Sequence, residues 1–167
     1  MSYVKASGWD SARVERVCAA LAAERSDSEL TFERLAEWHR IAMGAGEIER
    51  FRVLPAFAKG GRERYGVDAT TAGEFANCLR EGAEPGMAPA ARAARVYLDV
   101  CFFHPFSDGN GRAAMLAFDH VLGRAGVVLD QAGPVFAVSR RADDPEGARE
   151  LVRLVDILIA ATESRAR

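Results

Sequence analysis

One stretch of nine residues, placed between two apolar helix-forming runs, constrains this chain more than any other feature. Residues 90–103 before it and 113–122 after it are rich in alanine and larger apolar residues, and both runs are long enough for helices. The stretch from His104 to Arg112 combines a base, an acid and a cation with two glycines. The sequence therefore predicts two helices joined by a tight loop, with polar chemistry at the entrance of the second helix.

The composition of this helix entrance indicates an anion-binding site. The first backbone N–H groups of a helix have no intrahelical acceptor, and the helix dipole favours phosphate there. Gly109 and Gly111 allow a ligand to approach the backbone closely. Asp108 is a hard oxygen ligand of the kind that Mg²⁺ uses beside nucleotide phosphates, and Arg112 can neutralise phosphate charge. His104 is suited to proton transfer near neutral pH, so the set indicates phosphoryl or nucleotidyl transfer to a hydroxyl.

Composition and charge set limits on the class of protein. With 167 residues the chain is long enough for a sizeable core, and without repeats or linkers we expect a single domain over residues 1–167. A net charge of −2 with no long basic run argues against a nucleic-acid partner. Three widely spaced cysteines in apolar surroundings are typical of reduced core residues. No signal peptide or membrane-spanning run is present in the sequence, so we expect a cytoplasmic protein without membrane contact.

Four further helices are predicted from apolar spacing and capping residues. They run from Asp10 or Ser11 to about Glu24, from Thr31 to Gly44, from Thr71 to the loop at Gly82, and from Asp144 onwards through Pro145. Thr71 and Glu74 have the spacing of a capping box. His39 has no partner at metal-ligand spacing, which predicts a packing or surface residue. Periodicity alone does not decide whether residues 127–130 and 134–138 are extended or helical.

Residues 51–67 have the pattern of a short β-hairpin. Large apolar residues alternate with others between Phe51 and Phe57, and Lys59-Gly60-Gly61 offers a turn. Pro55 cannot donate to a strand ladder, so its strand is predicted at an edge. An exposed edge can pair with the backbone of a partner, and from the spacing alone a docking role and a hairpin without a binding role are equally compatible.

The nine residues His104-Pro105-Phe106-Ser107-Asp108-Gly109-Asn110-Gly111-Arg112 resemble the signature of the Fic (Fic/Doc) domain family, His-x-Phe-x-(Asp/Glu)-Gly-Asn-Gly-Arg-x-x-Arg. A weaker resemblance extends from roughly Thr31 to about Leu158, which gives a domain core of about residues 31–160. The resemblance implies a mainly α fold, a helical bundle with a short β-hairpin flap. It also implies that the flap, residues 51–67, docks a protein target.

The resemblance implies a role for each signature residue. His104 would be the catalytic base on a Ser, Thr or Tyr hydroxyl of the target, and Phe106 would anchor the loop in the core. Asp108 would be the Mg²⁺ ligand, and Arg112 would hold the outer phosphates of a nucleotide. An anion hole would be formed by three successive residues, Gly109, Asn110 and Gly111. The implied activity is that of a protein adenylyltransferase (AMPylator) with ATP as co-substrate, and an antitoxin is a candidate partner.

Met115 departs from the family signature, because it stands where the second arginine belongs. In the Fic family that arginine contacts the γ-phosphate and pairs with an inhibitory glutamate. Doc-type members also lack it and resemble kinases, but they carry lysine where this chain has Gly111. We therefore expect transfer of AMP or another nucleoside monophosphate. The alternatives are a Doc-like protein kinase and a catalytically weak Fic-fold module that binds nucleotides and regulates a partner.

The regulatory segment of the family is absent in full. Its pattern is (Ser/Thr)-x-x-x-Glu-(Gly/Asn), and the nearest approach here, Ser11 to Glu15, is followed by Arg16. With methionine at position 115 such a glutamate would have no arginine to pair with, so we expect no self-inhibition by this route. Three other basic residues are candidates for the missing positive charge: Arg124, Arg140 and Arg141.

A rival hypothesis comes from a different class of protein. The segment from Gly109 to Ala114 also fits the dinucleotide fingerprint Gly-x-Gly-x-x-(Gly/Ala), and Asp130 follows at about the distance of a ribose-binding acid. On this hypothesis residues 96–103 form the first strand of a dinucleotide-binding oxidoreductase domain. The residues from His104 to Asp108 separate that strand from the glycines, and the chain lacks the alternating strands of a doubly wound sheet. The rival is therefore the remote alternative.

Overall fold

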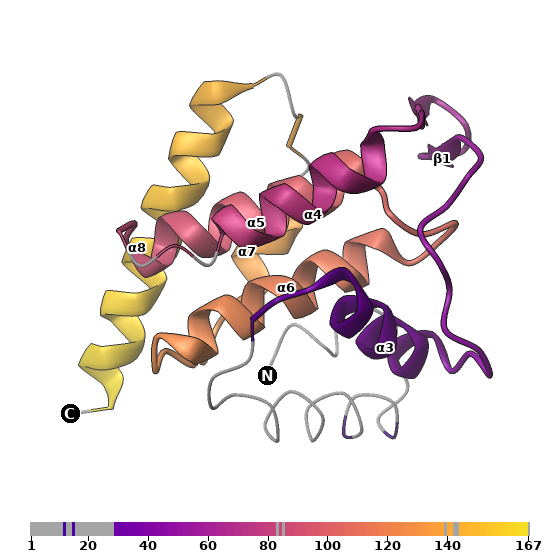
Figure 1. The fold of residues 1–167 in the computed structure, drawn as a ribbon. Coiled ribbons are helices and arrows are strands. Elements are labelled where there is room, and N and C mark those ends of the chain that lie inside the picture. Colours follow the sequence, from indigo (N-terminus) through magenta and orange to yellow (C-terminus); the bar gives the residue numbers. More distant parts are fainter. Residues whose placement is uncertain are drawn as a thin grey trace.

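The structure, a computed structural model, describes residues 12, 15, 29–82, 84, 86–138, 140–141 and 144–166. Over these residues it is mainly helical and contains one two-stranded antiparallel sheet (Figure 1). The elements in chain order are α3 (Phe32–Met43), β1 (Ala56–Ala58), β2 (Glu63–Tyr65), α4 (Thr71–Glu81), α5 (Pro89–Phe103), α6 (Asn110–Arg124), α7 (Gly133–Ala137) and α8 (Pro145–Arg165). The expected class, a mainly α protein with a short hairpin, is confirmed. The helix predicted from Asp10 or Ser11 to Glu24 lies outside the described residues, apart from positions 12 and 15.

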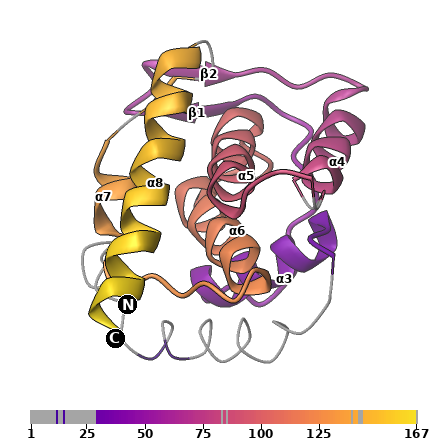
Figure 2. The same cartoon turned by 90° about the vertical axis from the view of Figure 1, so that its left-hand side faces the viewer.

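Helices α5 and α6 form the centre of the bundle. They pack along their length through small side chains that are almost fully buried, namely Ala93, Ala94, Ala113, Ala114 and Ala117. Alanine at these positions allows the two backbones to approach closely, as the composition of both runs predicts. Figure 2 shows the remaining helices on two sides of this pair, with α7 and α8 on one side and α3 and α4 on the other. The loop between α5 and α6 is thus held by a rigid pair.

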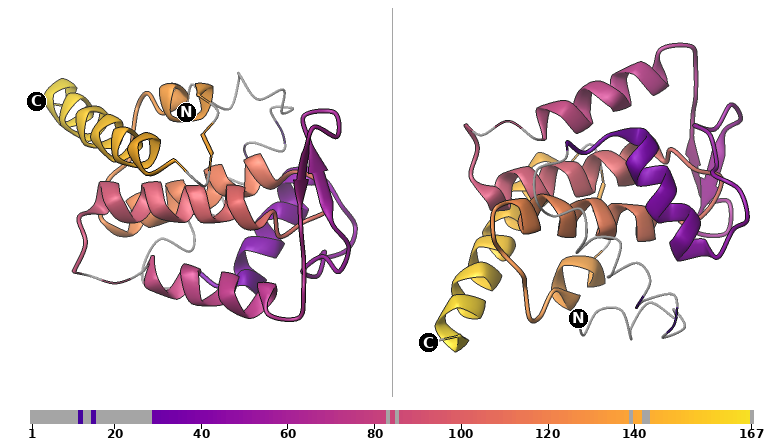
Figure 3. Two further views of the ribbon diagram at one scale, coloured as in Figure 1. Left: turned by 90° about the horizontal axis from the view of Figure 1, so that it is seen from above. Right: turned by 60° about the horizontal axis from the view of Figure 1, so that its bottom comes forward.

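The hairpin lies at the end of the bundle where α5 ends and α6 begins (Figures 1 and 3). Its strands pair in antiparallel register with Phe57 opposite Arg64, and the turn lies at residues 59–62. The predicted hairpin over residues 51–67 is therefore present, with shorter strands than the alternation suggested. Since the same end of the bundle carries the loop from His104 to Gly109, the fold brings the two sequence-predicted functional segments together.

Helix capping explains most of the helix boundaries. Thr31 caps α3 by accepting a hydrogen bond from the N–H of Arg34, and Gly44 ends that helix in the left-handed conformation. Asp144 caps α8 by accepting from the N–H of Gly147, with Pro145 in the first turn. These boundaries agree with the capping residues in the sequence.

The start of α4 differs from the predicted capping box. Thr71 is the first helical residue and not the cap, because the carboxylate of Asp68 accepts hydrogen bonds from the N–H groups of both Thr70 and Thr71. Glu74 instead accepts from the Thr70 hydroxyl at 2.9 Å. The acid in the preceding loop satisfies the free N–H groups more directly than a threonine can, so it takes over the capping role.

Two other boundaries could not be read from periodicity. Helix α6 begins at Asn110, three residues before the apolar run, so the last four residues of the signature, 109–112, form its cap and first turn. Of the two undecided segments, residues 127–130 are irregular, and the second contains the short helix α7. None of the described helices is both long and apolar enough to cross a membrane.

The close contact between α5 and α6 makes a prediction about stability. Replacing Ala117 by leucine adds volume at a position with no exposed surface, so we expect the free energy of unfolding to fall by about 1–3 kcal/mol. The matched control is Ala160→Leu on the exposed face of α8, which should change stability by less than about 0.5 kcal/mol. Urea denaturation of both variants measures the difference, and equal stability of the two variants would contradict close packing at Ala117.

Candidate active site

The loop begins with a backbone conformation that non-glycine residues rarely adopt. His104 ends α5 in the left-handed region, with φ 46° and ψ 63°. For an L-residue this conformation costs on the order of 1 kcal/mol or more, so surrounding contacts must maintain it. The conformation turns the chain sharply after α5, and it leaves the imidazole at the mouth of the loop.

Arg52 supplies the contacts that hold this turn. Its side chain is buried, with 8% of its surface exposed. The guanidinium donates to four backbone carbonyl groups, those of Leu54, Gly66, Phe103 and His104. In addition, the backbone N–H of Arg52 donates to the carbonyl of Pro105 at 3.0 Å. One cation therefore joins the segment before β1 and the segment after β2 to the end of α5. The sequence pattern did not predict this role.

The imidazole of His104 is held as a neutral base, and its Nε2 has no hydrogen-bond partner among the described residues. Its Nδ1 lies 2.6 Å from the carbonyl oxygen of Cys101, and because a carbonyl only accepts, Nδ1 carries the proton and Nε2 remains available. Burial lowers the pKa of His104 from its ordinary value of 6.5, although the Cys101 carbonyl opposes this shift. The ring of Tyr65, from β2, stacks on the imidazole with centroids 3.5 Å apart. The base is thus covered by the hairpin.

Two buried side chains fix the middle of the loop. Phe106 is fully buried and stacks against His39, with ring centroids 3.9 Å apart. Asn110 is 4% exposed, and its amide both accepts from the N–H and donates to the carbonyl of Phe106, each at 2.9 Å. The side chain of Asn110 is therefore occupied by the loop, which leaves its backbone N–H as the group it can offer to an anion.

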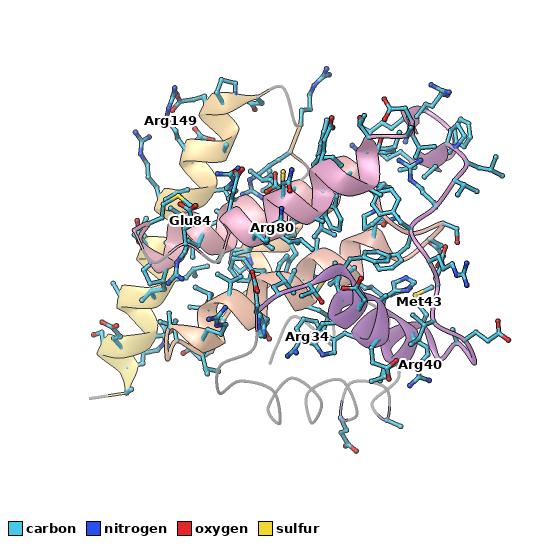
Figure 4. All side chains as sticks on the ribbon, viewed as in Figure 1. Arg34, Arg40, Met43, Arg80, Glu84 and Arg149 are labelled. Atoms are coloured by element: carbon cyan, nitrogen blue, oxygen red, sulfur yellow. The ribbon has the colours of Figure 1, made fainter. Side chains whose placement is uncertain are left out.

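His39 is a packing residue, as the sequence predicts, and it also anchors the loop. Its ring is buried, and Nε2 donates to the carbonyl oxygen of Asp108 at 2.9 Å. Burial lowers the pKa of His39, and a neutral ring with its proton on Nε2 matches this hydrogen bond. In Figure 4, Met43, one turn further along α3, lies on the side of the molecule that carries the hairpin. Its sulfur accepts from Nη1 of Arg112 at 2.9 Å.

The two glycines of the loop are needed for different reasons. Gly109 has φ +74°, and a Cβ there would lie 2.6 Å from the sulfur of Met43 and 2.8 Å from Nε2 of His39. A Cβ on Gly111 would meet no atom within 4 Å, and Gly111 is exposed. Packing therefore requires glycine at 109, whereas at 111 the missing side chain leaves open space at the first turn of α6.

The first turn of α6 carries the groups that an anion needs. Among the described residues, no acceptor contacts the backbone N–H groups of Asn110 and Gly111. Within the same part of the chain, Arg112 has no carboxylate within ion-pair distance; its recorded side-chain contact is the sulfur of Met43. Free N–H groups and an uncompensated guanidinium at a helix N-terminus favour phosphate or another anion.

A cleft of about 600 Å³ joins these features. It is lined by the hairpin turn, by His104, by residues 107–112 of the loop and first helical turn, and by three further side chains, Tyr97, Met115 and Phe136. The structure therefore brings His104, Asp108, Gly109, Asn110, Gly111 and Arg112 together in the lining of one cleft, while Phe106 is buried beneath it. Arg124, Arg140 and Arg141 do not line this cleft.

Among the described residues that line the cleft, Asp108 is the one carboxylate that could bind a divalent cation. No group of three or more His, Cys, Asp or Glu side chains suited to a metal occurs among the described residues. Asp108 lines the cleft with an exposed carboxylate, one oxygen of which accepts from the N–H of Gly109. Mg²⁺ is commonly bound by one or two carboxylates together with substrate phosphates and water, so this donor set fits Mg²⁺ delivered with a nucleotide.

The features required by the dinucleotide hypothesis do not occur in the described parts of the chain. There the sheet has two antiparallel strands, and residues 96–103 belong to α5 instead of a strand. Asp130, the supposed ribose ligand, forms an ion pair with Arg165 at 2.6 Å and accepts from Thr162. That hypothesis is wrong, because the Gly-x-Gly segment begins α6 and is preceded by a helix, not by a strand.

Comparison with known proteins agrees with this architecture. The family model of the Fic/DOC family matches residues 29–122, which is more than half of the chain. The chain belongs to the Fic/DOC family. The matched region contains the hairpin, α5, the signature loop and all of α6 except its last two residues.

The matches to individual relatives cover only a small part of each relative's length. The protein adenylyltransferase fic-1 of Caenorhabditis briggsae is 27% identical over 125 residues, which cover 71% of this chain and 24% of that protein. A segment of 32 residues is 56% identical to the ribonucleoside-diphosphate reductase small chain of Ostreid herpesvirus 1, covering 19% of this chain and 6% of the other. The chain thus spans less than a quarter of each relative.

A solved structure shares the fold at low sequence identity. Fic-1 of C. elegans superposes with a TM-score of 0.56 and 19% identity, covering 92% of this chain and 50% of the solved chain. At this identity the likeness concerns the fold. It supports the arrangement of helices around the α5–α6 pair.

The two glycines give a matched pair of predictions. Gly109→Ala should lower the free energy of unfolding by at least about 2 kcal/mol, because it combines a left-handed backbone with contacts shorter than 3.0 Å. Gly111→Ala should leave stability unchanged or raise it by up to about 1 kcal/mol, since alanine favours the helix. At the same time its methyl group should weaken nucleotide binding by filling the open space. Urea denaturation and calorimetric titration with ATP measure both effects, and a Gly111→Ala variant that binds ATP like the parent would contradict an anion site there.

Proposed function

We propose that this protein transfers a nucleoside monophosphate from a nucleotide to a hydroxyl group of a protein target. The observation that carries the proposal is that one cleft is lined both by a neutral His104 and by the N-terminus of α6; among the described residues, Nε2 of His104 and the first N–H groups of α6 have no hydrogen-bond partner, and Arg112 has no carboxylate partner. Membership of the Fic/DOC family supports a transferase of this type, and a relative in Caenorhabditis briggsae is named a protein adenylyltransferase.

His104 acts as the general base in the proposed reaction. Nδ1–H donates to the carbonyl of Cys101, and Nε2 takes the proton from a Ser, Thr or Tyr hydroxyl of the target. The hydroxyl oxygen attacks the α-phosphorus, the bond between that phosphorus and the bridging oxygen breaks, and with a nucleoside triphosphate pyrophosphate leaves. The orientation of the ring is maintained by the stack on Tyr65 and by the contacts of Arg52 to the carbonyl groups of Phe103 and His104.

The loop supplies the charge stabilisation. The N–H groups of Asn110 and Gly111 face no protein acceptor in the described structure, so they can bind the oxygens of the transferring phosphate without reorganisation. Arg112 neutralises the neighbouring phosphate. Mg²⁺ held by Asp108 and the donor phosphates would supply further positive charge near the leaving group. Each such preorganised donor is typically worth ~10²–10³ in rate.

The hairpin is the proposed docking surface for the target. Val53, Leu54 and Phe57 are large apolar side chains with 85%, 73% and 60% of their surface exposed, and they occur next to β1 or in it. An exposed strand edge with apolar side chains favours the addition of a partner strand. A target segment paired with β1 would lie above the cleft into which His104 opens. This placement supports a protein hydroxyl as the acceptor.

Label transfer tests the proposed reaction. Incubation with ATP labelled at the α- or the γ-phosphate and with cell extract or purified target should place the α label, and not the γ label, on protein. His104→Ala and Arg112→Ala should each reduce transfer by at least about 10²-fold, because each removes one group of the site. Arg124→Ala, on the exposed far end of α6, is the matched control and should keep the activity.

The alternative functions give different labels. Transfer of the γ label that is lost in His104→Ala would replace nucleotidyl transfer by a Doc-like protein kinase. Binding of nucleotide without transfer of either label would identify the catalytically weak regulatory module. Neither outcome agrees with the proposal.

The neutral state of His104 predicts the pH dependence. Because burial lowers its pKa, the imidazole should remain unprotonated, and the base active, at pH values below the ordinary midpoint of 6.5. The midpoint is measured by NMR titration of the imidazole in the protein without nucleotide, with the His104→Ala spectrum for assignment. We expect a midpoint below 6.5 and an acid limb of kcat/KM at the same pH. A midpoint above 6.5 would show that the ring is more exposed, or closer to an acid, than in this structure.

A further inference from the structure

The lining of the cleft has two chemically different parts. One part is polar and consists of His104 and residues 107–112. The other is formed by Tyr97 of α5, Met115 of α6 and Phe136 of α7, which come from three helices. The rings of Tyr97 and Phe136 lie with centroids 5.5 Å apart, and Phe118 packs edge-on against Phe136 at 5.6 Å. This second part is therefore an ordered apolar wall.

Met115 lies next to both parts of this lining. It lies three residues after Arg112 in α6, so the two side chains project from the same face of the helix one turn apart. Met115 is 9% exposed, and this exposed part lines the cleft. A ligand bound at the helix N-terminus that extends past Arg112 next meets the thioether of Met115 and the aromatic wall. A third phosphate placed there would contact apolar groups in place of a cation.

The positive charge available in the cleft supports the same conclusion. Two of the described lining residues, Lys59 and Arg112, are cations, and Lys59 forms an ion pair with Glu63 at 2.7 Å. Arg140 approaches this region from beyond α7, but its Nη1 donates to the carbonyl groups of Val135 and Val138 at 2.8 and 3.0 Å. Burial raises the pKa of Tyr97, so its phenol stays neutral. Bringing a terminal phosphate against this wall would cost desolvation, and the cation beyond it, Arg140, already donates to two carbonyl groups and does not line the cleft.

We propose, building on the nucleotidyl transfer argued above, that the preferred donor is a nucleoside diphosphate whose β-phosphate is esterified with an uncharged aromatic or apolar group. Gly111 and Arg112 bind the diphosphate, and Tyr97, Met115 and Phe136 bind the terminal group. In the reaction the target oxygen bonds to the α-phosphorus, the bond from that phosphorus to the bridging oxygen breaks, and Nε2 of His104 takes the hydroxyl proton. The leaving group is the phosphate monoester of the terminal group.

Calorimetric titration of the full chain in Mg²⁺ buffer tests this donor class. The probes are ATP, ADP, and adenosine 5′-diphosphate esterified on the β-phosphate with methanol or with benzyl alcohol; the two esters carry the same charge. We expect ATP and ADP to bind within about three-fold of each other, and the benzyl ester to bind at least ten-fold tighter than the methyl ester and than ATP. ATP binding ten-fold tighter than ADP, or equal affinity of the two esters, would overturn the inference while leaving nucleotidyl transfer intact. Failure of every probe to bind would overturn the proposed function itself.

Variants of the apolar wall locate the effect. Met115→Arg should create a preference of at least ten-fold for ATP over ADP and remove the advantage of the benzyl ester, whereas the matched Met115→Leu variant should behave like the parent. Phe136→Leu, at a partly exposed position, should weaken the benzyl ester at least five-fold and leave ADP unchanged. A loss of ATP affinity relative to ADP in Arg140→Ala would show that Arg140 reaches a third phosphate, and this result would contradict the inference. Melting temperatures of all variants establish that each is folded.

Discussion

The buried guanidinium of Arg52 is the interaction on which the site depends. Its donors contact carbonyl groups at Leu54 and Gly66, on the two arms of the hairpin, and at Phe103 and His104, at the end of α5. The last carbonyls of a helix have no intrahelical partner, and a charged donor satisfies them strongly. The same contacts compensate the cost of burying the cation, and burial lowers the pKa of Arg52 from its ordinary value. A single side chain therefore fixes where the base lies relative to the hairpin.

A second set of contacts prepares the loop for an anion. Asn110 holds the backbone of Phe106, His39 holds the carbonyl of Asp108, and Glu49 accepts from the N–H of Ser107 at 2.7 Å. Each satisfies a polar group of the loop with a side chain from the protein. Within the first turn of α6, the N–H groups of Asn110 and Gly111 have no protein acceptor among the described residues. The loop is thus ordered before any ligand binds, which is the condition for strong electrostatic stabilisation.

Much of the fold could be predicted from the sequence because its boundaries depend on local chemistry. Helix α5 begins at Pro89 and ends before Pro105, and α8 begins at the Asp144-Pro145 pair. The start of α4 at Thr71 was predicted correctly, but its cap was not, because Asp68 accepts from the N–H groups that the capping-box pattern assigned to the threonine. The signature residues could be predicted from the sequence because they are contiguous. Arg52, Tyr65 and Phe136 could not be predicted, because they reach the site through contacts between segments far apart in the sequence, and such contacts leave no periodic signal.

The stacking of Tyr65 on His104 couples the hairpin to the imidazole. The ring that covers the imidazole belongs to β2, which is paired with β1, the strand proposed to dock the target. In the proposed reaction one hairpin would therefore serve both recognition and proton abstraction. A polypeptide that twists the hairpin on docking would also shift the ring of Tyr65 over the imidazole, so the reactivity of His104 would depend on whether the hairpin is occupied.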